Sequence, residues 1–131
     1  MTNEDKKLLL IDLSARLHYG VKGIITYDKS NTTFTVEGID NNVLHLSDAE
    51  ECYVEDFKPY LRPMSSMTEE EYKDLCNSCT WLWFKNDLRT VTHGDYKCYD
   101  WLNAHHFDYR GLIEKGLALE APEGMYNIKE K

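Results

Sequence analysis

The first hydrophobic stripe of the chain predicts an amphipathic helix over residues 4–17. Leucines recur there at intervals of three or four residues, which places them on one side of a helix. These residues are Leu9, Leu10, Leu13 and Leu17. Thr2 or Asn3 can cap the amino-terminal end of this helix, and Tyr19-Gly20 ends the pattern.

After Gly20 the pattern changes to the alternation of apolar and polar residues that is typical of strands. The predicted strands cover residues 21–27, 33–38, 43–46, 52–54 and 57–61. Segments rich in Asp and Asn separate the first of them and supply turns, because these residues tolerate left-handed backbone. Four or five short strands predict a small antiparallel sheet or an SH3-like barrel, and the sequence does not decide whether the sheet closes.

A second helix is predicted to begin at Thr68, which forms a capping box with Glu71. Two continuations are compatible with the pattern that follows. Either the helix is buried on two faces and runs on through Trp83, or it ends near residue 80 and a hairpin follows over 81–92. The remaining expected elements are a helix from Thr92 or Asp95 to His105, a helix from Asp108 to Gly116, a strand over 117–119 and a tail from Pro122.

These elements predict an α+β fold. The first lobe, residues 1–64, combines an N-terminal helix with a small antiparallel β-sheet or SH3-like barrel. The second lobe, residues 65–131, is mainly helical. We expect the two lobes to pack as one compact unit, because a chain of 131 residues is long enough to bury one ordinary core.

The composition excludes several classes of protein. The chain has 15 Lys and Arg against 23 Asp and Glu, a formal net charge of −8, and its apolar runs are short. A membrane-spanning helix needs about 20 apolar residues, so we expect no membrane insertion. The acidic N-terminus does not resemble a secretory signal, and we expect a cytoplasmic protein. Nucleic-acid binding is disfavoured, because it requires clustered Lys and Arg.

The sharpest motif has the ligand spacing of a zinc finger: Cys76-x2-Cys79, followed by His93 and Cys98. The competing interpretation is that these cysteines are core thiols. Cys76 and Cys79 lie on the apolar stripe of the second helix, and free cysteine is among the most buried residue types. The core interpretation is favoured, so we predict neither a metal nor a cofactor.

No catalytic site is predicted. Adjacent His105 and His106 point about 100° apart on a helix, so they do not chelate one ion as an i, i+4 pair would. We expect one of them against the core and the other near solvent. The sequence has no Ser/His/Asp arrangement, no phosphate-binding glycine loop and no HExxH motif. We therefore expect a protein that is not an enzyme.

Two segments are candidate binding surfaces. One is a basic and aromatic segment between prolines, of a kind that can stack on bases or bind an acidic partner. The other is an apolar, tryptophan-rich run, which would mark a protein interface if the fold leaves it uncovered. The candidate residues are Lys58, Tyr60, Arg62, Trp81, Trp83 and Phe84. Packing within the fold is the alternative interpretation of both segments.

Two blocks of sequence resemble a family of short hypothetical proteins from gut bacteria and their bacteriophages. They are KPYLRPMSSMTEEE over residues 58–71 and WLNAHHFDYRGLIEKGLA over residues 101–118. Residues 77–97 lie outside the resemblance. The resemblance implies a phage or mobile-element setting and assigns no catalytic residue.

The expected function is a non-enzymatic binding module that acts through protein contacts. Its partner would be another protein or a second copy of the chain. Two alternatives are a small barrel protein that associates with nucleic acid through Lys58 and Arg62, and an acidic inhibitor of a host defence enzyme.

Overall fold

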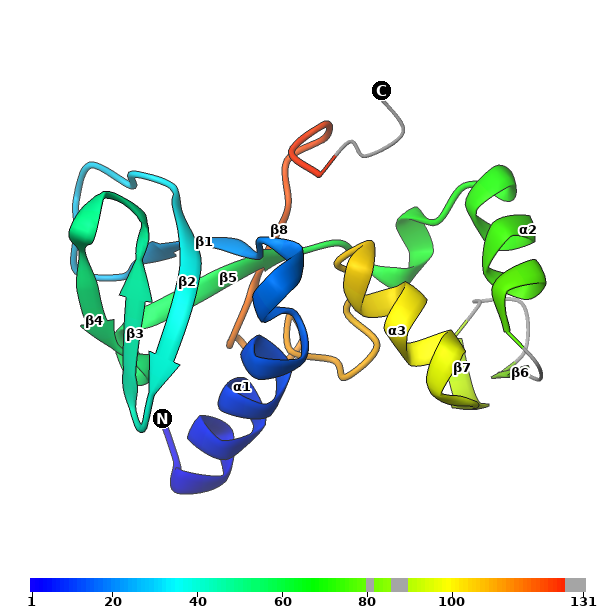
Figure 1. Ribbon diagram of the computed structural model, residues 1–131, viewed down its shortest axis with the longest axis horizontal. Helices are drawn as coiled ribbons and strands as arrows, with labels where there is room; N and C mark the ends of the chain where they lie inside the picture. The colour runs from blue at the N-terminus through cyan, green and yellow to red at the C-terminus, as the bar shows by residue number, and fades with distance from the viewer. Residues whose placement is uncertain (80–81, 86–89, 127–131) are drawn as a thin grey trace.

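The chain folds into a strand-rich lobe and a helical lobe. The computed structural model describes residues 1–79, 82–85 and 90–126, and its described side chains exclude those of residues 80–93. In Figure 1 most strands of the larger sheet lie toward one end, and two helices and a two-stranded hairpin lie at the other. The N-terminal helix and the C-terminal segment as far as residue 126 lie between these ends. Among the described residues, no helix is both long and apolar enough to cross a bilayer.

The elements alternate between short strands and short helices. The α-helices are α1 (Asn3–Ala15), α2 (Glu69–Ser78) and α3 (Tyr96–Ala104). The 3-10 helices are η1 (Leu17–Tyr19), η2 (Ser47–Ala49), η3 (Val54–Asp56) and η4 (Met64–Ser66). The strands are β1 (Lys22–Ile25), β2 (Phe34–Asp40), β3 (Val43–Leu46), β4 (Glu51–Tyr53), β5 (Phe57–Leu61), β6 (Leu82–Lys85), β7 (Thr90–Gly94) and β8 (Leu119–Glu120).

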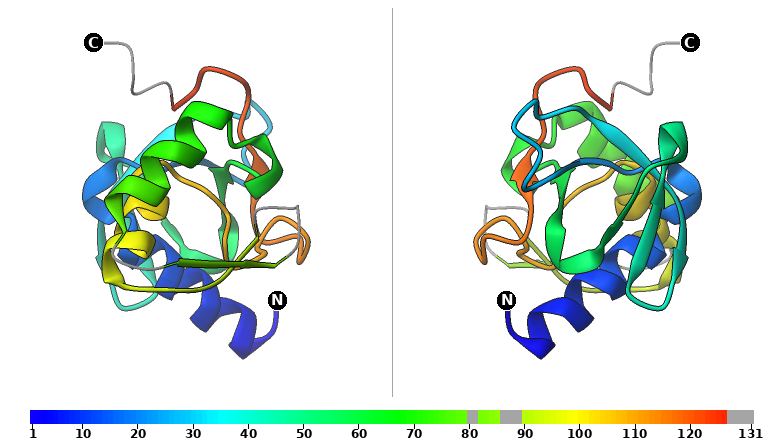
Figure 2. Two further views of the ribbon diagram at one scale, coloured as in Figure 1. Left: turned by 90° about the vertical axis from the view of Figure 1, so that its right-hand side faces the viewer. Right: turned by 90° about the vertical axis from the view of Figure 1, so that its left-hand side faces the viewer.

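Six of these strands form one open sheet, in the order β4-β3-β2-β1-β5-β8. All neighbours are antiparallel except β5 and β8. The sheet curves strongly in the end-on views of Figure 2, and a register shift between Val36 and Gly38 interrupts the pairing of β2 with β3. Because β4 and β8 remain at opposite edges, the sheet does not close and the SH3-like barrel is not formed. The α+β prediction is confirmed in its open-sheet form.

The first core lies between α1 and the sheet. Leu9 and Leu13 of α1 are fully buried against strand residues that include Val36 and Phe57. Strands β1 and β5 approach closely at Gly23, where a Cβ would lie 2.5 Å from the carbonyl oxygen of Lys58. Helix α1 has the predicted N-cap, since the hydroxyl oxygen of Thr2 accepts from a backbone N–H in the first turn.

Helix α2 resolves the choice that the sequence left open. The predicted capping box is present, with Thr68 and Glu71 each accepting from the other's backbone N–H. The helix ends at Ser78, and Cys79 is extended with φ −102° and ψ 148°. Strands β6 and β7 then pair antiparallel. The hairpin alternative is therefore confirmed.

The short helix predicted from Asp108 to Gly116 is wrong, because this segment forms turns. The carboxylate of Asp108 does accept from backbone amides, at Leu112 (2.8 Å) and Ile113 (2.9 Å). These amides lie four and five residues on, rather than two or three as at a helix N-cap. Gly111 is left-handed at φ 77°, which interrupts helical geometry at the point where the helix would begin.

The tail predicted from Pro122 is also wrong as far as Tyr126, which docks between β1 and β5. Its hydroxyl accepts the N–H of Lys22 at 2.7 Å and lies 2.9 Å from the carbonyl oxygen of Tyr60. The register of these strands places Lys22 opposite Tyr60, one step beyond the pair Gly23↔Pro59. The hydroxyl thus bridges two backbone groups that face each other across the strand pair. The ring of Tyr126 stacks on His106 at 3.8 Å.

Tyr126→Phe is expected to lower the free energy of unfolding by about 1–3 kcal/mol, because it leaves the Lys22 N–H inside the fold without its acceptor. Urea unfolding of the variant and the wild type measures the difference. Tyr27→Phe is the matched control, since Tyr27 is 66% exposed, and it should change stability by less than about 0.5 kcal/mol. Equal urea midpoints for Tyr126→Phe and the wild type would show that the hydroxyl of Tyr126 does not bridge the two strands.

Candidate functional site

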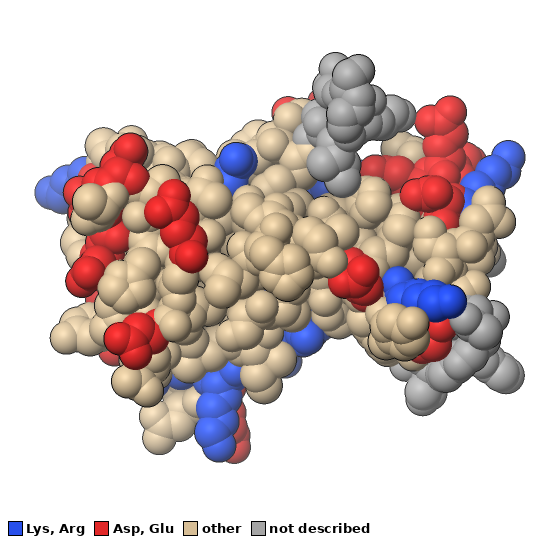
Figure 3. All heavy atoms as spheres, viewed as in Figure 1, with Lys and Arg blue, Asp and Glu red and all other residues tan. Residues whose placement is uncertain are grey.

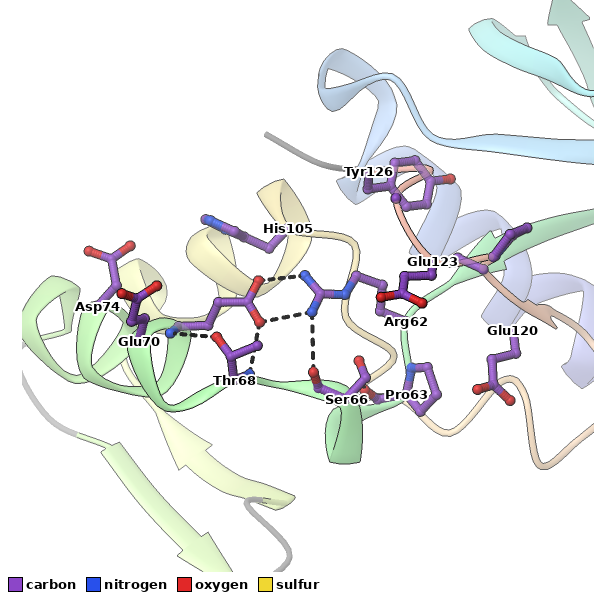
Figure 4. A pocket seen from close by; sticks show the side chains of 14 residues that line it. Arg62, Pro63, Ser66, Thr68, Glu70, Asp74, His105, Glu120, Glu123 and Tyr126 are labelled. Atoms are coloured by element: carbon purple, nitrogen blue, oxygen red, sulfur yellow. Dashed lines mark hydrogen bonds and ion pairs between the residues drawn. The ribbon is translucent and has the colours of Figure 1, made fainter. Parts of the chain in front are cut away.

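An open groove of about 890 Å³ lies beside Arg62 (Figure 4). Helix α2 forms one wall, and the segment that follows β8 forms the other. The charged and imidazole side chains that line the groove are Arg62, Glu70, Glu71, Asp74, His105, Glu120 and Glu123. Carboxylates therefore dominate its lining.

Arg62, the only Lys or Arg among the described residues that line the groove, already has a partner inside the protein. Its guanidinium donates to both carboxylate oxygens of Glu71, at 2.7 and 2.8 Å, and lies over the ring of Phe107 at 4.1 Å from the centroid. The backbone of Arg62 also hydrogen-bonds with His106 and Asp108. Arg62 thus joins β5 to α2, and Glu71 offsets its charge.

Glu71 both caps the start of α2 and pairs with Arg62. One of its oxygens accepts from the backbone N–H of Thr68 at 2.9 Å and also from Arg62. Burial alone would raise the pKa of Glu71, but the hydrogen bonds from Arg62 and Thr68 and the charge of Arg62 outweigh burial and lower it. The start of α2 is therefore fixed to the end of β5 by a carboxylate that stays ionised.

The other carboxylates give the groove its negative charge. Asp74 accepts from the indole N–H of Trp101 at 2.8 Å, which fixes it on the α2 wall. Glu120 and Glu123 project from the opposite side (Figure 4). Since Glu71 offsets Arg62, the electrostatics of the groove favour a cationic group over a phosphate.

A second acidic surface covers the strand lobe. Residues 30–57 contain seven Asp and Glu and no Lys or Arg. Six of these acidic residues are exposed: Glu37, Asp40, Asp48, Glu50, Glu51 and Glu55. Acidic side chains are spread over the strand lobe in Figure 3. We call these six residues the acidic strand surface.

The two histidines diverge as expected. His106 is buried, and its Nε2 lies 3.1 Å from the carbonyl oxygen of Tyr19, to which it donates. Among the described residues, its Nδ1 has no hydrogen-bond partner. His105 is half-buried and stacks on Trp101 at 3.8 Å. The pair does not converge on a common ligand.

The cysteines occupy two parts of the fold. Cys52 is buried in β4, whereas Cys79 and Cys98 lie between α2 and α3, with Cys98 fully buried. Cys76 is exposed, so only some of the predicted core thiols are in the core. No three His, Cys, Asp or Glu side chains within the described part of the chain are placed to hold a metal ion. The side chain of His93, the fourth zinc candidate, lies outside that part.

The predicted binding segments have different outcomes. Lys58 and Tyr60 are half-buried in β5, so their segment is part of the sheet. Trp81 lies outside the described residues. The backbone of Trp83 and Phe84 lies in β6, but their side chains are not described. The tryptophan-rich surface thus stays a prediction.

A buried ion-pair network was missed from the sequence. Arg16 donates to both oxygens of Asp12, at 2.9 and 3.0 Å, and both side chains are fully buried. Arg110 donates to Asp12 at 2.6 Å, and Arg16 reaches the carbonyl oxygen of Phe107 at 2.6 Å. The i, i+4 spacing of Asp12 and Arg16 was a signal for a helix ion pair. No feature of the neighbouring sequence indicated that the pair is buried.

Comparison with known proteins leaves the geometry as the basis for assigning a function. No family model, no curated protein and no solved structure matches the chain. The groove and the acidic strand surface therefore have to be interpreted from their own residues.

His106 is expected to make stability depend on pH. Burial, together with the nearby charge of Arg16, lowers the pKa of His106 to about 3. As pH falls below the ordinary histidine value of 6.5, the unfolded chain takes up a proton that the folded protein does not. The free energy of unfolding should therefore fall, by about 2 kcal/mol from this group between about pH 7.5 and 5.

His106→Asn tests this expectation, because asparagine tolerates the left-handed backbone at this position (φ 62°) and does not titrate. Urea unfolding at the two pH values should show that the variant loses about 2 kcal/mol less than the wild type on acidification. His18→Asn, at an exposed histidine, is the control and should retain the wild-type difference. The same loss in His106→Asn as in the wild type would contradict the assignment.

Proposed function

We propose that the protein is a non-enzymatic binding module whose acidic strand surface binds a basic region of a partner protein. The observation that carries this proposal is the charge distribution of residues 30–57, with seven acidic residues and no Lys or Arg. Six of these side chains are exposed. A surface of one sign attracts a partner of the opposite sign and increases the rate of encounter.

The side chains that most often carry catalysis support a binding role, because they serve packing. The imidazole of His106 is buried, His105 stacks on an indole, and Arg62 pairs with Glu71. The pair of Arg62 and Glu71 joins β5 to α2. None of these contacts uses the exposed carboxylates, which are the groups that a partner meets first.

An acidic inhibitor is a second candidate function, favoured by the same surface. A protein that presents carboxylates over a small sheet can occupy the basic, nucleic-acid-binding surface of a host defence enzyme. Binding to the enzyme in competition with DNA or RNA would distinguish this role from binding to another basic protein.

A matched pair of variants tests the proposed surface. Glu50→Gln with Glu55→Gln removes two charges from the acidic strand surface, and Glu4→Gln with Glu114→Gln removes two exposed charges outside both that surface and the groove. Binding of a Lys- and Arg-rich peptide at low ionic strength should weaken roughly two- to thirtyfold in the first variant, at about 0.2–1 kcal/mol per exposed contact. It should change little in the second. Isothermal titration calorimetry measures both affinities.

Equal weakening of peptide binding in the two variants would refute a localised surface, since net charge alone would then explain it. High salt should weaken wild-type binding, because exposed charges are screened beyond about 8–10 Å. Binding that is insensitive to salt would also oppose the proposal.

A further inference from the structure

Three of the four cysteines lie close together where α2 packs against α3. The thiols of Cys79 and Cys98 are hydrogen-bonded to each other, and Cys76 is near enough to affect both electrostatically. Cys98 is fully buried within the core of the helical lobe, and Cys79 packs against that core. Cys52, in β4, belongs to the other core. The proposed function uses none of these thiols.

The pair is asymmetric. Cys79 is partly exposed at the end of α2, whereas Cys98 is inside the core. The hydrogen bond from Cys98 favours ionisation of Cys79, and the same bond disfavours ionisation of Cys98. Cys79 is therefore the thiol that an external reagent meets and the one that ionises first. Cys98 is placed behind it.

The contacts of Cys79 favour Cys98 over Cys76 as its disulfide partner. Cys76 lies within α2 and is exposed, and it affects Cys79 only electrostatically. A disulfide needs a Cβ separation of about 3.8 Å. Cys79 also leaves the helix with an extended backbone, and its thiol is in hydrogen-bond contact with Cys98.

We propose that Cys79 and Cys98 are a modification site, at which a low-molecular-weight disulfide such as oxidised glutathione converts the two thiols into a reversible intramolecular disulfide. The bond would link the end of α2 to α3 and close a loop around the β6–β7 hairpin. It would also fix α2, which forms one wall of the acidic groove.

The reaction balances as a thiol–disulfide exchange. The Cys79 thiolate, whose proton goes to solvent, attacks one sulfur of the oxidant and displaces the first thiolate. Cys98 then loses its proton and attacks the Cys79 sulfur in this mixed disulfide, which displaces the second thiolate. The leaving thiolates take up the two protons. The protein dithiol is thereby oxidised by two electrons, and the oxidant is reduced to two thiols.

The experiment should measure the equilibrium constant for disulfide formation rather than its rate. Burial raises the pKa of Cys79 and raises the pKa of Cys98 to about 12, so little thiolate is present at neutral pH and exchange is slow. The experiment therefore equilibrates the protein with mixtures of reduced and oxidised glutathione, once in buffer and once in denaturing urea. Acid quenching and peptide mass spectrometry then identify each cross-link.

The native wild-type protein should form the cross-link between Cys79 and Cys98. Its equilibrium constant should exceed that of the unfolded chain by about tenfold or more, because a fold that holds two thiols in contact favours their disulfide. The variant Cys52→Ser with Cys76→Ser keeps only the proposed pair and should give the same constant. Cys79→Ser is the control in which no intramolecular bond forms at Cys98.

Three results would overturn the proposal. One is a cross-link between Cys76 and Cys79 in place of the proposed pair. Another is a glutathione adduct that persists at Cys79 in the native protein. The third is an equilibrium constant in the native protein that is no larger than in urea, which would show that the fold does not prepare the bond.

Discussion

The structure depends on a buried charge network at the junction of its two lobes. Asp12 lies between two guanidiniums, those of Arg16 and Arg110, and Arg16 also donates to the carbonyl oxygen of Phe107. The contacts join α1 to a segment more than 90 residues away in the chain. Buried charges are costly to desolvate, and removal of one partner typically costs about 3–5 kcal/mol. The network therefore fixes how the strand lobe and the helical lobe meet.

Short-range features of the fold were predictable, and long-range ones were not. The capping box of Thr68 and Glu71 was read correctly because both partners lie within four residues. The second role of Glu71, its ion pair with Arg62, depends on how β5 meets α2. The docking of Tyr126 was missed because its hydroxyl binds backbone groups, which every position carries and no sequence pattern distinguishes. Closure of the sheet likewise depends on whether its two edge strands pair with each other, which the alternation of apolar and polar residues does not indicate.

The candidate site shows the same division. The acidic residues of 30–57 are visible in the sequence, and the exposed ones lie on β2, on β4 and in the short connections between strands. The groove beside Arg62 requires that the loop after β8 lie opposite α2, which brings Glu71 and Glu123 to one hollow. Arg62 was expected at a binding surface, but its guanidinium pairs with Glu71 and joins β5 to α2. Arg62 thus contributes to stability, and the proposed recognition rests on the exposed acidic groups.

The central claim is that Asp12 couples the two cores into one cooperative unit. Asp12→Asn tests it most directly, with unfolding in urea followed by two probes. Tryptophan fluorescence reports the C-terminal half of the chain, since all three tryptophans fall within residues 65–131 of the sequence, and hydrogen exchange of β2 and β3 reports the sheet. The wild-type transitions should coincide, and those of the variant should separate. Coincident transitions in Asp12→Asn would contradict the account.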